Sequence, residues 1–302
     1  MSNNAMSVAV LGPGGVGGLV AALVARAGHR VICLAREETA RTLRTEGIRV
    51  RSGQFGEFTA RVEADTVLRE PVDACVVAVK QTGLAESLER VPVAVLGDGL
   101  LVPLLNGVEH LELLRERYRP ELVVPAVIRV ESTRVATGVV EHGSPFTEID
   151  LAESSVPRDR VDALGQAFAD AGIAVKVLDD EATVLWAKLS FLAPFALLTT
   201  RYAVPIGTVR TEHRDELLAL TEETVAVSRA CGGPADATAT LARYDSFPAQ
   251  AKSSMQRDAE AGRPLELDAI GGALLRAAQR HGIATPVAAR LVAELRAGGR
   301  AG

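Results

Sequence analysis

The chain has 302 residues, of which 48% are hydrophobic and 24% charged, and its formal net charge is −5 at pH 7. This composition is ordinary for a folded globular protein, and the length allows one large domain or two of average size. The acidic balance, together with the lack of a polybasic run, excludes a general attraction to nucleic acid or to anionic membranes.

The cysteines Cys33, Cys75 and Cys231 lie far apart in the sequence, and the five histidines are equally scattered. This usage predicts a reducing compartment, no disulfide framework and no metal site. No secretory signal is visible, and the apolar run Leu189–Leu198 is too short to span a bilayer. We therefore expect a cytoplasmic protein. Residues 1–5 precede a second methionine, so they are either a remnant added to the natural chain or the result of an alternative start, and we expect them to play no part in the fold.

From Val8 to about Leu178, short β-branched runs alternate with amphipathic stretches, as in βαβ units. Predicted strands are VAVLG, RVICLAR, DACVVAVK and LLVPLLNG, and GLVAALVARAG predicts a helix. The continuous apolar character of DACVVAVK and LLVPLLNG favours buried parallel strands. Residues 126–152 suit a more exposed antiparallel portion of the same sheet. A further helix and strand are predicted in VDALGQAFADAG and IAVKVL.

After Asp179 and Asp180 the pattern changes, because nearly everything up to Arg300 has helical periodicity. The sequence therefore predicts an α/β fold with two domains. We expect residues 1–178 to form a Rossmann-type α/β domain and residues 179–302 to form an all-α domain.

A glycine-rich segment, VAVLGPGGVGG, follows the first predicted strand and opens the first predicted helix. Its spacing, glycine at 12, 14 and 17, suits a tight turn, close approach of a pyrophosphate and close helix–strand packing. Amide groups at the helix start would hold the phosphates. The alternative is a purely structural glycine turn. The predicted cofactor-binding residues in this segment are Gly12, Gly14, Gly15, Val16 and Gly17.

Three polar residues follow predicted strands. Arg36 ends the second strand, where NADP-binding sites place a cation near the 2′-phosphate, so we expect NADPH. The alternative is a solvated surface arginine. Lys80 and Asn106 close later strands, at the sheet edge where open α/β proteins bind ligands. Asn106 is followed by Gly107, and Asn-Gly is also a common turn dipeptide.

Lys188 lies in the otherwise apolar segment LWAKLSFLAPFALLTT. At helical spacing its neighbours on the same face are Leu192 and Ala196, neither of which pairs with a charge. Such a lysine either extends past its helix to water or has a chemical task.

The ordered motifs resemble the ketopantoate reductases (2-dehydropantoate 2-reductases). They are GPGGVG, an arginine after the second strand, VAVK, LLNG, LWAKLS, SSM and LELDAIGG, and they span Val8 to about Pro286. The resemblance implies NADPH-dependent reduction of ketopantoate, a 2-oxo acid, to (R)-pantoate in pantothenate biosynthesis. It also implies that Arg36 and Lys80 contact the 2′-phosphate region, and that Asn106 lies by the nicotinamide ribose and the substrate.

In the same resemblance, Lys188 is the catalytic lysine, since a positioned ammonium stabilises the charge that builds on the ketone oxygen and supplies its proton. Ser254 is implied to face the substrate carboxylate, and Glu266 a substrate hydroxyl. Without the resemblance, Ser253 and Ser254 also suit a helix start, and Glu266 suits a position near a helix N-terminus.

The chain departs from the family pattern on the lysine helix. The family usually carries asparagines four and eight residues after the lysine, and here those positions hold Leu192 and Ala196. Losing both amides removes hydrogen bonds from a site that reads a substrate hydroxyl, and such losses change selectivity strongly. One alternative is therefore a related enzyme acting on a more apolar 2-oxo acid.

Two other functions stay open at this point. A β-hydroxyacid dehydrogenase shares a Rossmann domain, a helical domain and a catalytic lysine, although its small-residue segment between domains is not evident. A non-catalytic NADPH-binding sensor would use the glycine turn and Arg36 and leave Lys188 structural. The expected partner is a small molecule and not a nucleic acid or a membrane, and long apolar-faced helices are compatible with a homodimer.

Overall fold

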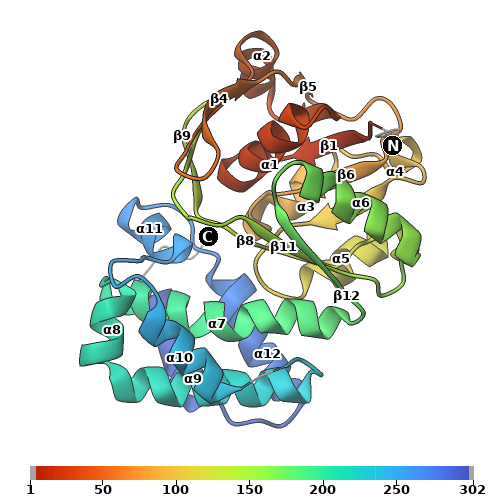
Figure 1. The fold of residues 1–302 in the computed structure, drawn as a ribbon. Coiled ribbons are helices and arrows are strands. Elements are labelled where there is room, and N and C mark those ends of the chain that lie inside the picture. The colour runs from red at the N-terminus through yellow and green to blue at the C-terminus, as the bar shows by residue number, and fades with distance from the viewer. Residues whose placement is uncertain (1–4, 235, 299–302) are drawn as a thin grey trace. The chain divides into compact units, whose positions relative to one another are not determined.

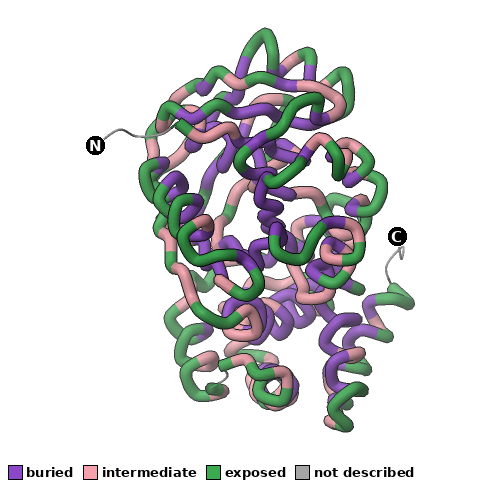
Figure 2. Tube along the Cα trace, turned by 90° about the vertical axis from the view of Figure 1, so that its right-hand side faces the viewer, coloured by how far each residue is buried: buried purple, intermediate pink, exposed green. Residues whose placement is uncertain are grey.

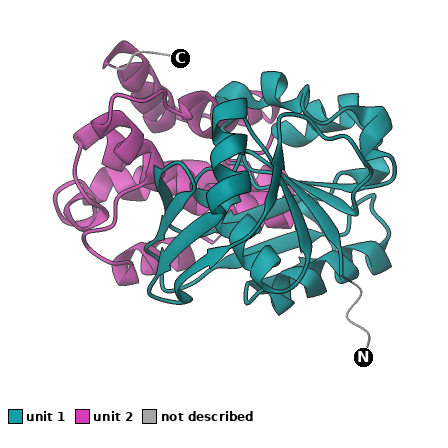
Figure 3. Ribbon diagram, turned by 90° about the horizontal axis from the view of Figure 1, so that it is seen from above, with its two compact units in different colours: residues 1–105, 110–181 teal, residues 106–109, 182–302 magenta. Residues whose placement is uncertain are grey.

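The computed structural model of the chain describes residues 5–234 and 236–298, so most of the segment before the second methionine lies outside the described residues. The helices and strands are labelled in Figure 1. The chain divides into two compact units, coloured separately in Figure 3. Unit 1 comprises residues 1–105 and 110–181, and unit 2 comprises residues 106–109 and 182–302.

The main sheet of unit 1 has five strands in the order β5-β2-β1-β6-β7, all paired in parallel. The chain runs outward from β1 to one side and then crosses back to β6, so β1 and β6 border the point where the strand order reverses. The strands are β1 (Ser7–Leu11), β2 (Arg30–Leu34), β5 (Glu63–Asp65), β6 (Ala74–Val77) and β7 (Leu100–Pro103). The predicted parallel strands are thereby confirmed.

The connecting helices of this sheet lie where the periodicity predicts them or fill the gaps between strands. They are α1 (Gly15–Arg26), α2 (Glu37–Glu46), α3 (Leu84–Leu88), α4 (Val93–Leu96) and α5 (His110–Arg117). Every residue of β6 and β7 is buried. Figure 2 shows buried segments of the chain in purple and exposed segments in green. Burial raises the pKa of the Cys33 and Cys75 thiols to about 12, so both are inert core residues.

Two smaller sheets complete unit 1, with strand orders β4-β3-β10-β9 and β12-β11-β8. Their elements are β3 (Ile48–Ser52), β4 (Gly56–Ala60), β8 (Ala126–Arg129), β9 (Ser132–Ala136), β10 (Val139–His142), β11 (Glu148–Ala152), α6 (Arg158–Asp170) and β12 (Ala174–Leu178). The placement of residues 126–152 in the main sheet was wrong. Antiparallel pairs do form there, but β9 pairs with β10 and β8 pairs with β11, in separate sheets.

The hairpin of β3 and β4 was not predicted, although β3 alternates buried and exposed residues as a half-buried strand should. Strand β10 pairs in parallel with β3, about ninety residues away in the sequence. Pairing at such separation depends on tertiary packing, which a periodicity argument does not contain.

Unit 2 is helical throughout its described residues, which confirms the predicted α/β plus all-α fold class. Its helices are α7 (Glu181–Tyr202), α8 (Ile206–Glu212), α9 (Arg214–Ala230), α10 (Ala237–Ser246), α11 (Ser254–Glu260), α12 (Ala273–Arg280) and α13 (Pro286–Gly298), with a π-helical turn at Asp268–Gly272. Only the first residue of α7, Glu181, belongs to unit 1.

Helix α7 is longer than the apolar run that the sequence singles out. The run Leu189–Leu198 lies inside a 22-residue helix that by length and hydropathy alone could cross a membrane, so the argument from shortness was wrong. Burial is the better reason to assign α7 to the protein core, because 67% of its most apolar window is buried within the protein. Leu197 and Leu198 are fully buried in the core of unit 2.

Candidate active site

The glycine turn of unit 1 needs glycine at position 12 for two reasons. Gly12 follows β1 with φ +85°, a conformation that residues with a side chain rarely adopt. A Cβ on Gly12 would also lie 2.5 Å from Val79 Cγ1 and 3.1 Å from Val79 N. At Gly17 a Cβ would lie only 2.3 Å from the Gly12 carbonyl oxygen. Internal packing therefore explains these two glycines.

Gly14 differs, because a Cβ there would meet nothing closer than the Gly12 oxygen at 3.9 Å. The protein's own packing does not require glycine at this position, which leaves space for a ligand to approach the backbone. Gly14 is also the N-cap of α1, with no side-chain cap and no acidic residue in the first turn. The uncapped amides of Gly15, Val16 and Gly17 thus fit the pyrophosphate of a dinucleotide.

Strand β9 of the four-stranded sheet contacts this turn through Ser132. The Ser132 hydroxyl, in β9, donates a hydrogen bond to the Gly15 carbonyl oxygen at 2.8 Å. A Cβ on Gly15 would lie 2.3 Å from the Ser132 carbonyl oxygen. Val16 is half-buried and packs against the core of unit 1. Sequence reasoning missed Ser132, since no local pattern links it to a turn 117 residues earlier.

Arg36 and Lys80 follow β2 and β6, the two strands on either side of β1. Both side chains are exposed, at the same carboxyl-end edge of the sheet as the glycine turn. Arg36 is the N-cap of α2, and within the described chain its guanidinium makes no hydrogen bond or ion pair. The topology therefore brings these predicted cofactor residues to one sheet edge.

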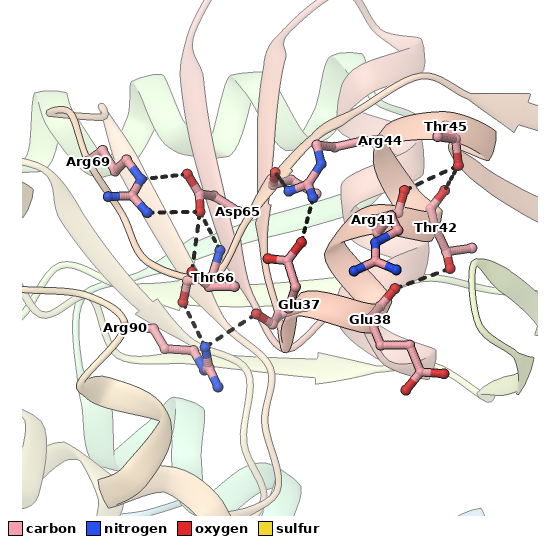
Figure 4. Close-up of polar contacts among 12 residues, drawn as sticks. Glu37, Glu38, Arg41, Thr42, Arg44, Thr45, Asp65, Thr66, Arg69 and Arg90 are labelled. Atoms are coloured by element: carbon pink, nitrogen blue, oxygen red, sulfur yellow. Dashed lines mark hydrogen bonds and ion pairs between the residues drawn. The ribbon is translucent and has the colours of Figure 1, made fainter.

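Two carboxylates beside the end of β2, those of Glu37 and Asp65, are paired with arginines, as Figure 4 shows. Arg44 Nη2 donates to Glu37 Oε1 at 2.9 Å, and Arg69 Nε donates to Asp65 Oδ2 at 2.8 Å. The Arg69 guanidinium, together with the Thr66 amide, holds the pKa of Asp65 below its ordinary value. Arg90 Nη1 donates to the carbonyl oxygens of Ala35 at 3.3 Å and Thr66 at 2.7 Å.

In unit 2, Asn106 and Glu266 meet directly. Asn106 Nδ2 donates to Glu266 Oε2 at 3.0 Å, and Glu266 is only 9% exposed. Gly107 has φ +86°, and a Cβ there would lie 2.3 Å from the Ala269 carbonyl oxygen in the π-helical turn. The Asn106–Gly107 dipeptide is thus a turn packed closely on the segment that carries Glu266. Two of the predicted substrate-binding residues are brought together, and π turns often mark functional sites.

An ion-pair network holds the same two segments together. Arg276 Nη2 lies 2.7 Å from Glu109 Oε2 and 3.0 Å from Asp268 Oδ2. The Arg276 guanidinium holds the pKa of Asp268 below its ordinary value. Glu109 is three residues after Asn106, and Asp268 is two residues after Glu266. The sequence gives no sign of this network, because Glu109 and Arg276 are 167 residues apart.

Lys188 lies on α7 and is half-buried, with Leu192 half-buried and Ala196 fully buried one and two turns further on. The Thr199 hydroxyl, on the same helix, lies 2.9 Å from the Ser253 hydroxyl. The described residues contain no group of three or more potential metal ligands.

Ser253 caps α11, as the helix-start interpretation expects, because its hydroxyl accepts a hydrogen bond from the Gln256 amide at 3.0 Å. Ser254, the first residue of that helix, is exposed. The hydrogen bond between the Ser253 and Thr199 hydroxyls connects the start of α11 to α7, the helix that carries Lys188.

Comparisons with known proteins agree with these features. Residues 8–155 match the family described as Ketopantoate reductase PanE/ApbA, and residues 181–298 match its C-terminal domain. The chain is 30% identical to a 2-dehydropantoate 2-reductase of Mycobacterium tuberculosis over 308 residues, covering 95% of this chain and 96% of that protein.

Solved structures show the same fold. A 2-dehydropantoate 2-reductase from Geobacter metallireducens superposes with a TM-score of 0.89 at 27% identity, covering 97% of this chain and 100% of that one. A D-mandelate dehydrogenase solved with NADH and anilino(oxo)acetate gives a TM-score of 0.87 at 18% identity, over 97% and 98% of the two chains. At that identity it is evidence of the fold alone. The protein is therefore a member of the ketopantoate reductase PanE/ApbA family, and it is a nicotinamide-dependent oxidoreductase.

Proposed function

We propose that the protein reduces ketopantoate to (R)-pantoate with NADPH, as a step of pantothenate biosynthesis in the cytoplasm. The observation that carries this proposal is the hydrogen bond between Asn106 and Glu266, which joins two residues expected to bind the substrate. In this proposal residues 1–178 bind the cofactor and contribute Asn106 to the substrate site, and residues 179–302 supply the other substrate-binding groups and the catalytic lysine.

NADPH supplies the hydride when it is bound. The amides of Gly15, Val16 and Gly17 hold its pyrophosphate, since they open a helix without a side-chain cap. Arg36 and Lys80, exposed at the same sheet edge, attract the 2′-phosphate. The open space beside Gly14 supports this placement, because it lets a ligand reach the backbone without displacing protein atoms.

The side chains of unit 2 bind and protonate the substrate in this proposal. Lys188 Nζ donates a proton to the ketone oxygen as negative charge develops there. The Glu266 carboxylate accepts a hydrogen bond from the substrate hydroxyl, while its bond to Asn106 keeps it oriented. The exposed Ser254 hydroxyl, at the start of α11, donates to the substrate carboxylate.

The test follows NADPH oxidation with ketopantoate in the wild type, in Lys188→Ala and in Lys176→Ala, a matched control at an exposed lysine of β12. We expect turnover in the wild type and the control, and a loss of about a hundredfold or more in Lys188→Ala while NADPH still binds. Cofactor binding with no turnover of any 2-oxo acid in the wild type contradicts the proposal and favours a sensor.

One observation favours a second candidate, a reductase of a more apolar 2-oxo acid. Besides Leu192 and Ala196, the lysine helix carries Phe191 and Phe195, whose ring centroids lie 5.3 and 5.7 Å from that of Phe247. Phe191 and Phe247 are half-buried and Phe195 is buried, and these apolar surroundings suit an apolar substrate group. Comparing kcat/KM for ketopantoate with that for a 2-oxo acid lacking the hydroxyl decides between the two. A large preference for ketopantoate excludes the apolar candidate.

A further inference from the structure

The segment after β2 carries acidic side chains where an NADP-binding protein needs positive charge. Arg36 is followed directly by Glu37 and Glu38, at the first positions of α2. An acidic residue at this end of the second strand is what NAD-binding proteins use to bind ribose hydroxyls, and it repels a 2′-phosphate. Arg36 alone therefore does not account for a preference for NADPH.

The structure shows how the nearer carboxylate is neutralised. Glu37 Oε1 accepts a hydrogen bond from Arg44 Nη2 at 2.9 Å, two helical turns along α2. Arg44 is itself held, because its Nη1 donates to the Ala64 carbonyl oxygen of β5 at 3.0 Å. In Figure 4 the Glu37 side chain is directed toward Arg44, and the Glu38 side chain is directed away from it.

A second carboxylate beside β2, that of Asp65, is neutralised in a similar way. Asp65 pairs with Leu34 in the sheet register, and its carbonyl oxygen accepts a hydrogen bond from the Ala35 amide at 3.0 Å. Its carboxylate is bound by Arg69 and by the Thr66 amide. Glu37 and Asp65 thus each have an arginine partner, and the Glu38 side chain is directed away from Arg44, while the Arg36 guanidinium makes no ion pair within the described residues.

We propose that Arg44 sets the cofactor preference: by holding Glu37 it removes a negative charge that otherwise opposes the 2′-phosphate of NADPH. Arg44 is a positioning residue and does not itself contact the cofactor. The inference rests on the proposed use of NADPH and extends it to a residue that acts through Glu37.

The experiment measures dissociation constants for NADPH and NADH by titration, in the wild type, Arg44→Met, Glu37→Gln and the double variant. Arg61→Met is the matched control, since this exposed arginine also donates to a backbone oxygen, that of Thr45 at 2.7 Å, with no carboxylate partner in the described chain. Arg44→Met is expected to weaken NADPH binding about three- to tenfold and to change NADH binding less than about twofold.

The double variant tests whether Arg44 acts through Glu37. With Glu37→Gln present, Arg44→Met is expected to have no further effect on the NADPH-to-NADH ratio, and Arg44→Lys alone is expected to keep most of the wild-type ratio. An undiminished effect of Arg44→Met in the Glu37→Gln background overturns the inference, as does a wild-type ratio in Arg44→Met. If the wild type itself binds NADH more tightly than NADPH, the proposed cofactor is what fails, whatever the variants do.

Discussion

Asn106 and Glu266, 160 residues apart in the sequence, share a hydrogen bond of 3.0 Å in which the amide donates to a carboxylate that is 9% exposed. A buried carboxylate is stable only with donors around it. The bond therefore has a structural role as well as the proposed substrate-binding role, and the two can be separated by mutation.

Replacing Asn106 by leucine removes the amide donor while keeping the volume. We expect the free energy of unfolding to fall by about 1–3 kcal/mol, because the Glu266 carboxylate loses a partner in a buried position. Adding Glu266→Gln should restore much of that loss, since the neutral amide tolerates burial better, while activity stays low in both variants. Urea unfolding and steady-state kinetics measure the two effects. Equal stability of Asn106→Leu and wild type contradicts the structural role.

Glycines 14 and 17 should respond differently to alanine. Gly14→Ala meets no atom closer than 3.9 Å, so we expect its unfolding free energy to change by less than about 1 kcal/mol while cofactor binding weakens at least about tenfold. Gly17→Ala places a Cβ 2.3 Å from the Gly12 oxygen, so it should destabilise the fold by about 2 kcal/mol or more. Thermal unfolding and NADPH titration test both. Unchanged cofactor affinity in Gly14→Ala contradicts the assignment of the turn.

The ion pair between Arg129 and Asp150 joins β8 to β11 at 2.6 Å, with side chains only 16% and 10% exposed. Asp150→Asn leaves the guanidinium buried without its counter-charge, so we expect a loss of about 3 kcal/mol in the free energy of unfolding. Glu57→Gln, which breaks the exposed pair with Arg49, serves as the control and should change stability little. Similar losses in the two variants contradict this explanation.

Stability should depend on pH through Glu181, the first residue of α7. Arg115 and the Ser154 hydroxyl bind its carboxylate and hold its pKa below the ordinary value. A depressed folded-state pKa contributes stability that is present above the unfolded pKa of about 4.3 and is lost as the pH falls through the lower, folded pKa. The stability difference between wild type and Glu181→Gln should thus be largest near neutral pH and shrink in acid. Urea unfolding at several pH values measures it, and a constant difference contradicts the assignment.

Restoring an amide on the lysine helix should shift substrate selectivity. Leu192 is half-buried, so Leu192→Asn has access to solvent or substrate, and we expect the ratio of kcat/KM for ketopantoate over a 2-oxo acid without the hydroxyl to rise about tenfold. Ala196 is fully buried, so Ala196→Asn should instead cost about 1–3 kcal/mol of stability. An unchanged ratio in Leu192→Asn means that this position does not face the substrate.

The sequence by itself determined the features that depend on neighbouring residues. The glycine spacing after β1 predicts a tight turn before a helix, and Gly12, with φ +85°, adopts a conformation suited to such a turn. Continuous apolar runs predict the buried parallel strands, and helical periodicity predicts the all-α second half, because period and burial are local properties.

Only the tertiary structure decided which distant segments meet. The pairing of β10 with β3 and the contact of Ser132 with Gly15 join segments that no local pattern relates. The bond of Asn106 to Glu266 likewise depends on the close packing of Gly107 on Ala269. Glu37 directly follows the predicted cofactor residue Arg36, and only the structure shows that its carboxylate is bound by Arg44. Such contacts depend on side-chain packing in three dimensions, and sequence spacing does not encode them.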